Sequence, residues 1–335
     1  MADSRPTHSR RSIAPYLRAA AAGILLAGVA GVASASVAGH ASGPPRAADS
    51  HRCTAASLAG TGSRDPLRGV CRYLRGREGV VQVALFDHNT GRTFLLSTGN
   101  DTQYTASIVK VDILAKWLHH YQNRGVAIPD GIPYSIQYLM EHMIENSDNA
   151  AATGLFYFGG GCRALTAFNN RIPLTHTTVG CQTPTYYGWG NTTTTAADQA
   201  RLMKIIAYGG RDDLVGSDAR NYQLKLMQNV EPDQRFGISC GPFGDVCNPP
   251  DYAPPKPGVT VALKNGWKTL PTCTEPIEQC PWQVNSMGWV SGEGRNYVLS
   301  VLTTNDPVGT GDTYGFDYGI STIQGISKLI WGNLG

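Results

Sequence analysis

Charged side chains are scarce in this chain. Asp, Glu, Lys and Arg together make up 16% of its 335 residues, whereas hydrophobic residues make up 41%. This balance argues against a disordered protein and fits a globular chain that is long enough to bury a core. The formal net charge is +3, and much of the basic excess lies at Arg5, Arg10, Arg11 and Arg18. The rest is nearly neutral, so the composition gives no support to nucleic-acid binding.

Long apolar runs are missing beyond residue 40. Within residues 1–40 the four arginines precede an Ala/Gly/Leu-rich segment with Ala-x-Ala-like sites, which predicts a secretion signal. An uncleaved membrane anchor is the alternative, and Ser9–Ile13 resembles a twin-arginine signal, so the export route stays open. The Gly/Pro/Ser-rich residues 41–60 are expected to form a flexible mature N-terminus. The sequence therefore predicts a secreted, extracytoplasmic protein with no stable membrane span after signal cleavage.

Metal-ligand spacings such as Cys-x2-Cys and His-x3-His are also missing, and no metal or cofactor is predicted. All eight cysteines lie beyond the signal, and an even count outside the cytosol favours disulfides. Sequence alone leaves about 105 pairings open. Pairing of nearest neighbours is the simplest hypothesis: Cys53–Cys71, Cys162–Cys181, Cys240–Cys247 and Cys273–Cys280.

Strand patterns occur at both ends of the chain, with helix patterns between them. Strands are predicted at 80–86, 92–96, 259–263, 282–290 and 297–302, and helices at 107–121, 136–145 (N-cap Ser135), 149–158, 161–169, 196–208 and 317–331. This order predicts an α/β protein of the α+β type, in which one sheet is assembled from both ends of the chain. We expect the sheet domain to comprise 61–104 and 211–335, with a helical domain inserted at 105–210.

Ser107 and Lys110 are separated by one helical turn at a predicted helix start. That spacing places a hydroxyl and an amine on one face, where the amine can take a proton from a serine nucleophile. A solvated first turn is the simpler alternative for this pair taken alone.

Two further polar triplets follow along the chain. Ser147-Asp148-Asn149 offers a second hydroxyl and a carboxamide, although such a triplet can equally cap a helix. Lys264-Asn265-Gly266 follows a β-rich run, and Asn-Gly is itself a strong hairpin-turn signal. Each triplet is weak evidence alone, whereas their order along the chain is informative.

The three segments together resemble the serine β-lactamase and penicillin-binding D,D-peptidase superfamily, most closely the class A β-lactamases. Members of that family carry Ser-x-x-Lys, Ser-Asp-Asn and Lys-Thr/Ser-Gly in this order. The resemblance extends from about Val80 to the C-terminus and includes Ser147–Ala152 and the Thr-rich run Thr192–Ala197. It implies a β-lactamase-like fold, with an antiparallel five-stranded sheet flanked by helices and an inserted all-helical domain.

The resemblance also implies roles for individual residues. Ser107 would be the nucleophile and Lys110 its proton acceptor, with Ser147 relaying a proton to the leaving nitrogen. Lys264 would lower the pKa of Lys110 and anchor an anionic substrate group. Substrate-binding contacts would come from four further residues: Asn149, Asn265, Gly266 and Trp267. The backbone N–H groups of Ser107 and Trp267 would form an oxyanion hole, each donor contributing about 3 kcal/mol.

Two departures from the class A pattern alter these expectations. Class A enzymes hydrolyse the acyl-enzyme with a glutamate on an Ω-shaped loop, but no Asp or Glu occurs from Ala150 through Ala197. His176 is the nearest conventional base, and an ordinary loop histidine is the simpler interpretation. Asn265 stands where a hydroxyl residue is usual, which predicts altered carboxylate recognition. The short interval from Lys110 to Ser147 implies a trimmed helical domain and a more open cleft.

These observations predict a secreted active-site serine hydrolase that forms an acyl-serine intermediate with β-lactams or D-Ala-type cell-wall peptides. Class A-type deacylation is not expected. Two alternatives are a catalytically silent cell-wall-binding module on the same fold and an esterase or acyl transferase. The predicted partner is a small-molecule or peptide substrate, a β-lactam or peptidoglycan stem peptide, with no nucleic acid, and we expect a monomer.

Overall fold

The computed structural model describes residues 54–57, 65–99, 102–181, 187–210, 214–243, 256–270, 273–275, 279–304, 306–307 and 315–335. The predicted secretion signal at 1–40 lies outside these residues, as does most of the segment 41–60. No helix in the described part of the chain is both long and apolar enough to cross a membrane.

The main sheet is antiparallel and contains strands from both ends of the chain, as predicted. Its strands run in the order β1-β3-β2-β8-β7-β6, and a separate two-stranded sheet pairs β4 with β5. The strands are β1 (Thr54–Ser57), β2 (Val80–Asp87), β3 (Arg92–Ser97), β4 (Gln103–Tyr104), β5 (Thr193–Thr194), β6 (Val259–Thr269), β7 (Trp282–Gly292) and β8 (Arg295–Thr304). The five predicted strands are all present, and β1 adds a sixth at the edge. Residues 54–57 therefore pair with β3, which corrects the expectation that all of 41–60 is a flexible end.

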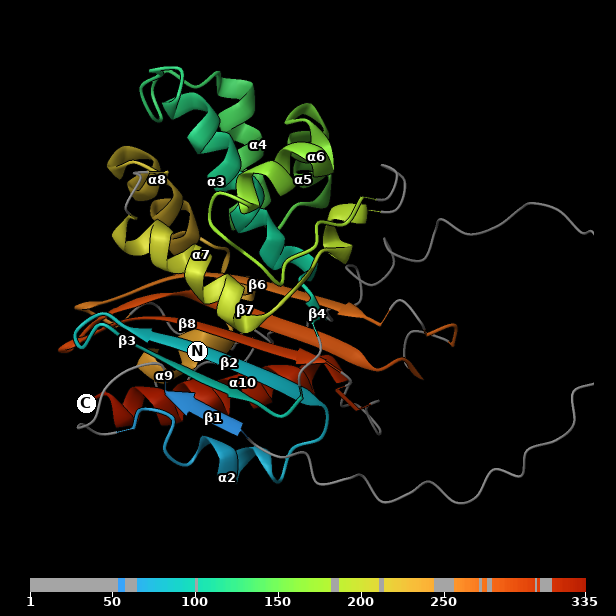
Figure 1. Cartoon of the computed structure of the whole chain (residues 1–335), viewed down its shortest axis with the longest axis vertical. Helices are drawn as coiled ribbons and strands as arrows, with labels where there is room; N and C mark the ends of the chain where they lie inside the picture. The colour runs from blue at the N-terminus through green and yellow to red at the C-terminus, as the bar shows by residue number, and fades with distance from the viewer. Residues whose placement is uncertain are drawn as a thin grey trace, which may run out of the picture. The chain divides into compact units, whose positions relative to one another are not determined.

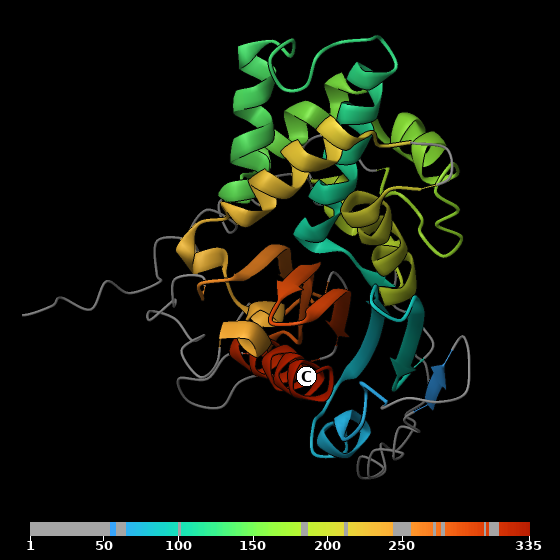
Figure 2. The same ribbon diagram turned by 90° about the vertical axis from the view of Figure 1, so that its left-hand side faces the viewer.

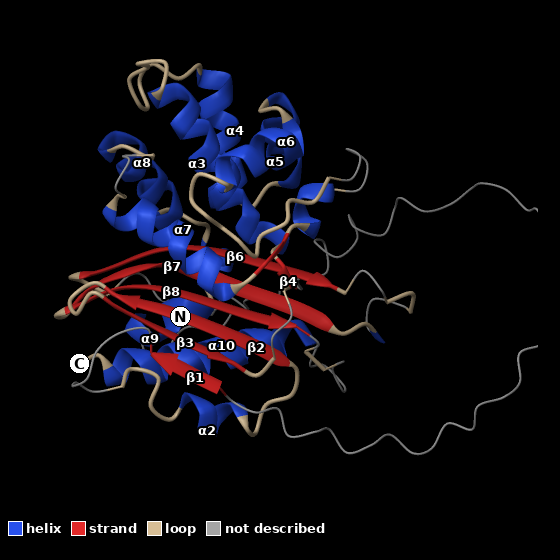
Figure 3. Ribbon diagram, in the orientation of Figure 1, coloured by secondary structure: helices blue, strands red, loops and turns tan. Residues whose placement is uncertain are grey.

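Helices lie on both sides of this sheet (Figures 1 and 3). The α-helices are α2 (Val70–Leu74), α3 (Val109–Gln122), α4 (Tyr134–Glu145), α5 (Asn149–Phe158), α6 (Gly161–Asn169), α7 (Ala196–Tyr208), α8 (Ser217–Gln228), α9 (Cys240–Phe243) and α10 (Gly315–Asn333). The described residues also form four short 3-10 helices: η1 (Ala106–Ile108), η3 (Gly188–Asn191), η4 (Pro232–Gln234) and η5 (Gly237–Ser239). Helix α10 packs on β7 and β8 from one side, while α7 packs on β2, β7 and β8 from the other. Strand β2 is buried along nearly its whole length, so both of its faces are covered, which fits its mostly apolar sequence.

Helices α4, α5, α6 and α8 gather around α3 (Figure 2), whereas α2 and α9 pack against α10. Helix α3 contacts α4, α5, α6 and α8, and its buried residues fill the centre of this group. Helix α8 lies within the range expected for the sheet domain, yet it packs against α3 and α4 as well as β6. The helical region thus continues beyond residue 210, although the division into two domains remains a prediction.

Local expectations were corrected at two points. Helix α4 begins at Tyr134 with Pro133 as its N-cap, so the predicted cap at Ser135 is wrong. Strand β6 runs straight through residues 264–266, which excludes the alternative of a hairpin turn there. The turn that joins β7 to β8 lies instead at Glu293 and Gly294, which have φ angles of 50° and 79°.

Two predicted disulfides are confirmed, Cys162–Cys181 and Cys273–Cys280. Cys71 and Cys240 are also disulfide-bonded. Their predicted partners, Cys53 and Cys247, lie outside the described residues, so those two pairings stay predictions.

Candidate active site

Ser107 lies in a turn that is fixed from several directions. Strand β4 pairs with β5, and the backbone N–H of Thr105 donates to the Thr192 carbonyl at 2.7 Å. The buried Asn285 of β7 donates from Nδ2 to the Tyr104 carbonyl at 2.8 Å and to the Thr105 carbonyl at 3.0 Å. The chain then enters η1 and α3, and Ser107 itself remains partly exposed. This arrangement presents an accessible hydroxyl on a firmly held backbone.

Lys110 lies one turn further along, and its side chain joins the first two motifs. Its Nζ lies 2.9 Å from Ser107 Oγ, 3.1 Å from Ser147 Oγ, 2.6 Å from the Ser147 carbonyl oxygen and 2.7 Å from Asn149 Oδ1. The side chain is completely buried. The structure therefore brings together Ser107, Lys110, Ser147 and Asn149, the four residues that the family resemblance places in one site, whereas their catalytic roles stay a prediction.

The electrostatic environment of Lys110 favours a neutral amine. Burial, followed by the positive charge of Lys264, lowers the pKa of Lys110 well below its ordinary value, with Asp148 acting in the opposite direction. A neutral amine has two N–H groups and one lone pair. The Ser147 carbonyl and Asn149 Oδ1 accept the two hydrogens, which leaves the lone pair for a serine hydroxyl. The geometry thus suits transfer of a proton from Ser107 to Lys110.

The loop between α4 and α5 supplies the second motif. Ser147 adopts a left-handed backbone with φ 57°, a conformation that costs on the order of 1–3 kcal/mol for a residue other than glycine. Asp148 then caps α5, with Oδ1 accepting from the Ala151 N–H at 2.6 Å. The turn directs both the hydroxyl and the carbonyl of Ser147 at Lys110, so backbone strain here coincides with the candidate site.

Lys264 is a second fully buried lysine, placed by β6. Its Nζ donates to the Asn265 carbonyl at 3.1 Å. Burial lowers the pKa of Lys264 to about 7, and the charge of Asp233 raises it in part. Lys264 therefore changes its charge near neutral pH, while lying close enough to lower the pKa of Lys110.

Gly266 brings β6 directly against the nucleophile turn. A Cβ atom at this position would lie 2.6 Å from the Ser107 nitrogen, 2.8 Å from the Ile108 nitrogen and 2.8 Å from the Thr105 carbonyl oxygen. All three neighbours are backbone atoms that cannot swing aside, so only glycine fits. Trp267 follows, and its ring packs on Phe236 at a centroid distance of 5.5 Å. The close approach of β6 to Ser107 is compatible with an oxyanion hole formed by the N–H groups of Ser107 and Trp267, which stays a prediction.

Asn265 faces into the fold. Its Nδ2 donates to the Gln234 carbonyl at 2.7 Å and to the Phe236 carbonyl at 3.1 Å, and the side chain is completely buried. Both amide hydrogens are therefore used to tie β6 to the segment of η4 and η5. A contact of the Asn265 Nδ2 group with substrate would require these two hydrogen bonds to break.

The segment expected to carry a deacylating carboxylate presents Trp189 instead. Lys110 Nζ lies 5.0 Å from the centroid of the Trp189 ring, and the buried indole Nε1 donates to Thr153 Oγ1 at 3.1 Å. Asp198, the first carboxylate after Asp148, lies in the first turn of α7, and its Oδ2 accepts from the His176 N–H at 2.8 Å. His176 itself is exposed, which fits an ordinary loop histidine. Sequence reasoning missed Trp189 and Asn285, because neither belongs to a recognisable motif.

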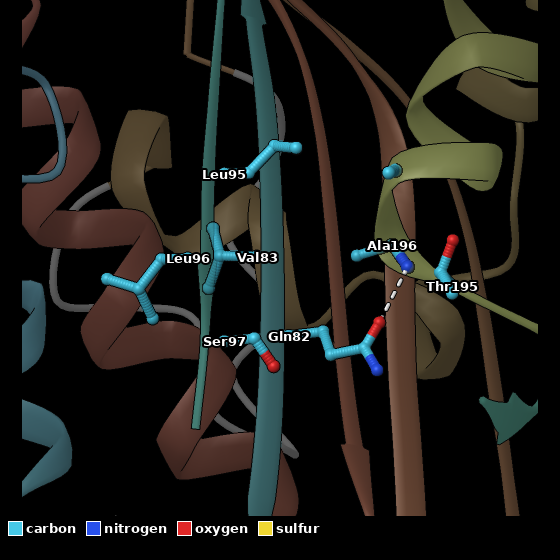
Figure 4. Close-up of a pocket in the computed structure, with 8 residues that line it drawn as sticks. Gln82, Val83, Leu95, Leu96, Ser97, Thr195 and Ala196 are labelled. Carbon is cyan, nitrogen blue, oxygen red and sulfur yellow. Dashed lines mark hydrogen bonds between the residues drawn. The ribbon is translucent and has the colours of Figure 1, made fainter. Parts of the chain in front are cut away.

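Two other features of the described residues bear on ligand binding. No group of three or more His, Cys, Asp or Glu side chains in the described part of the chain could hold a metal ion. A pocket lies between β2, β3 and the start of α7, where Gln82 Oε1 accepts from the Ala196 N–H at 3.1 Å (Figure 4). Ser107, Lys110, Ser147 and Asn149 are not among its lining residues, so this pocket is separate from the candidate active site.

Several solved structures share this fold. PBP-A is 20% identical, with a TM-score of 0.59 and coverage of 80% of this chain and 94% of that chain. A class A beta-lactamase from Mycobacterium abscessus is 17% identical, with a TM-score of 0.57 and coverage of 79% and 98%. The TLA-3 extended-spectrum beta-lactamase is 15% identical, with a TM-score of 0.59 and coverage of 80% and 97%. At such identities the likeness shows the fold alone, and it confirms the predicted β-lactamase-like architecture.

A comparison at the level of sequence gives the family. No curated protein matches this chain. The model of the beta-lactamase enzyme family matches residues 121–334, which include Ser147–Asn149 and Lys264–Gly266. The match covers well over half of the chain and agrees with the superfamily that the three motifs resemble. The chain belongs to the beta-lactamase enzyme family.

Proposed function

We propose that this protein is a secreted active-site serine hydrolase that acylates Ser107 with β-lactams or with D-Ala-type cell-wall peptides. The observation that carries the proposal is the position of Lys110 Nζ, 2.9 Å from Ser107 Oγ in a completely buried environment. A lysine is a useful base near neutral pH only when its pKa is depressed, and burial together with Lys264 lowers the pKa of Lys110. A variant of the structural relative PBP-A forms an acyl-enzyme with penicillin G, which supports the choice of probe.

The acylation step uses groups that already lie together. Ser107 Oγ loses its proton to the Lys110 amine and attacks the carbonyl carbon of the amide. Charge develops on the carbonyl oxygen, which the N–H groups of Ser107 and Trp267 would stabilise. When the C–N bond breaks, the proton passes from Lys110 through the Ser147 hydroxyl to the leaving nitrogen. The substrate is then an ester on Ser107, and Lys110 is again neutral.

Hydrolysis of that ester is proposed to be slow. The side of Lys110 that faces η3 is covered by Trp189, and residues 150–197 contain no carboxylate to activate a water molecule. Lys110 and Ser147 remain as the nearest proton acceptors, and they already serve acylation. A persistent acyl-enzyme is therefore expected, as is usual for a penicillin-binding peptidase challenged with a β-lactam.

Intact-mass spectrometry after incubation with benzylpenicillin tests the proposal. We expect the mass to rise by one whole benzylpenicillin molecule, because opening the β-lactam ring loses no atoms, and peptide mapping should place the adduct on Ser107. Ser107→Ala should acquire no adduct while keeping its circular dichroism spectrum. A folded protein that gives no adduct with benzylpenicillin, with a D-Ala-D-Ala thioester or with simple esters would contradict the proposal.

A catalytically silent binding module is the second candidate. It is favoured by the inward orientation of Asn265, whose amide hydrogens are taken by two backbone carbonyls. Such a module would bind the same ligands with equal affinity before and after Ser107→Ala, and neither form would become covalently modified.

A further inference from the structure

A third lysine lies beside the candidate active site and has no role in the scheme above. Lys268 is on β6, and side chains on a strand alternate between its faces, so Lys264, Gly266 and Lys268 share one face. Burial and the charge of Lys264 lower the pKa of Lys110, and Gly266 lies against the backbone of Ser107. Two residues of strand add about 7 Å, which places Lys268 on the same face of β6 as Lys264 but on the far side of Gly266.

The contacts of Lys268 confirm this placement independently of the strand pattern. Its Nζ donates to Oδ1 of Asn191, in the same short helix η3 as Trp189. The ammonium also lies 5.1 Å from the centroid of the Tyr104 ring, on the strand that leads into Ser107. Lys268 thus bridges two elements that border the candidate active site, and both bridging contacts come from electrically neutral groups.

No carboxylate within the described residues forms an ion pair with Lys268. Its side chain is only partly exposed, and burial lowers the pKa of Lys268 to about 8. A cation that is held in place, partly desolvated and bonded to neutral groups attracts an incoming anion more strongly than a free surface lysine does. A residue that only linked β6 to Asn191 and Tyr104 would not need a charged side chain.

The order of groups along β6 gives the side of the substrate that would meet Lys268. In the proposed reaction, Lys110, Ser147 and Lys264 serve the leaving nitrogen, and the carbonyl lies near Gly266 and Trp267. The acyl portion then extends along β6 away from Lys264. We propose that Lys268 recognises a carboxylate on the acyl side of the scissile amide, so that the enzyme prefers anionic acyl donors. This inference rests on the proposed function for its orientation.

Four penicillins that differ at a single carbon of the acyl side chain test this inference. Benzylpenicillin carries hydrogen at the α-carbon, carbenicillin a carboxylate, the primary amide of carbenicillin a neutral group of the same size, and ampicillin an ammonium. Acylation rates should follow the order carbenicillin, then the two neutral compounds, then ampicillin. Carbenicillin should exceed its amide by about tenfold.

Variants at position 268 separate recognition from structural support. Lys268→Met should abolish the preference for carbenicillin over its amide, whereas Lys268→Arg should retain it because the charge is kept. A loss of structural support would slow all four compounds by one common factor and leave the ratio unchanged, and that result would overturn the inference. Equal rates for carbenicillin and its amide in the native protein would overturn it as well.

Non-covalent binding makes the test independent of chemistry. Calorimetry with Ser107→Ala should show tighter binding of carbenicillin than of its amide, and the added Lys268→Met change should remove the difference. If the native protein never becomes acylated but this difference is present, the proposed hydrolase function fails and the anion site stands. If the difference is absent from Ser107→Ala, the anion site is wrong whatever the acylation experiments show.

Discussion

The two sides of the candidate cleft depart from the superfamily pattern to different degrees. On the helical side, Ser107, Lys110, Ser147 and Asn149 are joined through one buried amine. On the opposite side, where η3 meets β6, a tryptophan contacts that amine and Asn265 is turned into the fold. In the proposed mechanism the helical side holds the groups that would form an ester, whereas residues 150–197 contain no carboxylate to hydrolyse it. The groups for acylation are therefore retained in this mechanism, whereas the segment expected to supply a group for deacylation has changed.

The largest effect should follow removal of the Lys110 amine, which contacts both Ser107 and Ser147. Lys110→Met should lower the rate of acylation by benzylpenicillin about 10³-fold, because Ser107 loses its proton acceptor. Stopped-flow or quenched-flow mass spectrometry measures this rate. Lys204→Met is a matched control, since Lys204 is an exposed lysine on α7 that lies over the Phe86 ring. Comparable acylation rates for Lys110→Met and the native protein would show that Lys110 is not the proton acceptor of Ser107.

A smaller effect is expected where the two sides meet. Gly266→Ala places a methyl group against the backbone of Ser107, Ile108 and Thr105, so the nucleophile turn or β6 must shift. A displacement of about 1 Å can lower a rate about 100-fold, and we expect a loss of that order in acylation. Gly332→Ala in α10 is the control, because a Cβ there meets nothing within 4 Å. Equal activity of both variants would show that β6 does not position Ser107.

The pH dependence of acylation should reflect both lysines. Acylation needs Lys110 neutral, a form that increases as pH rises, and Lys264 charged, a form that decreases as pH rises through about 7. The rate should therefore fall about tenfold per pH unit on the alkaline side. Lys264→Arg stays charged and should lose this alkaline decline, even if its larger side chain lowers the overall rate. If the acylation rate of Lys264→Arg still falls at alkaline pH, a group other than Lys264 causes the decline.

The smallest expected effect concerns stability. Between the folded pKa of Lys264, about 7, and its ordinary value of 10.5, the unfolded chain binds more protons, so native stability rises with pH. Below pH 7 the folded protein bears the full cost of a buried ammonium. Lys264→Met should raise the free energy of unfolding by about 1–4 kcal/mol at pH 6 and by less at pH 9. Guanidinium unfolding at both pH values measures the free energy of unfolding. A Lys264→Met variant that is less stable than the native protein at pH 6 would contradict a cost for burying the Lys264 ammonium.

Much of the fold could be predicted from local patterns. Helices α5, α6 and α7 begin and end at the predicted residues, because apolar periodicity and clear boundaries act within each segment. Helix α8 was missed although Ala219, Tyr222 and Leu226 follow helical spacing, because most of its other residues are polar. The Asn-Gly pair in β6 shows the opposite error, since pairing with β7 overrides its preference for a turn.

The site was predictable only where chemistry is encoded by spacing. The turn from Ser107 to Lys110 is local, and the order of the three motifs indicates the rest. Trp189, Asn285 and Lys268 reach the site through contacts between distant segments, and no short pattern marks them. Asn265 shows the limit of inference by resemblance, because a matching position did not predict where the side chain points.

A single time course with a chromogenic cephalosporin tests the central claim most directly. The account predicts a rapid burst equal to one molecule of cephalosporin per protein, followed by slow turnover and a lasting adduct on Ser107. Sustained rapid turnover would contradict the assignment of deacylation, and a folded protein that shows neither burst nor adduct would contradict the role of Lys110 and Ser107.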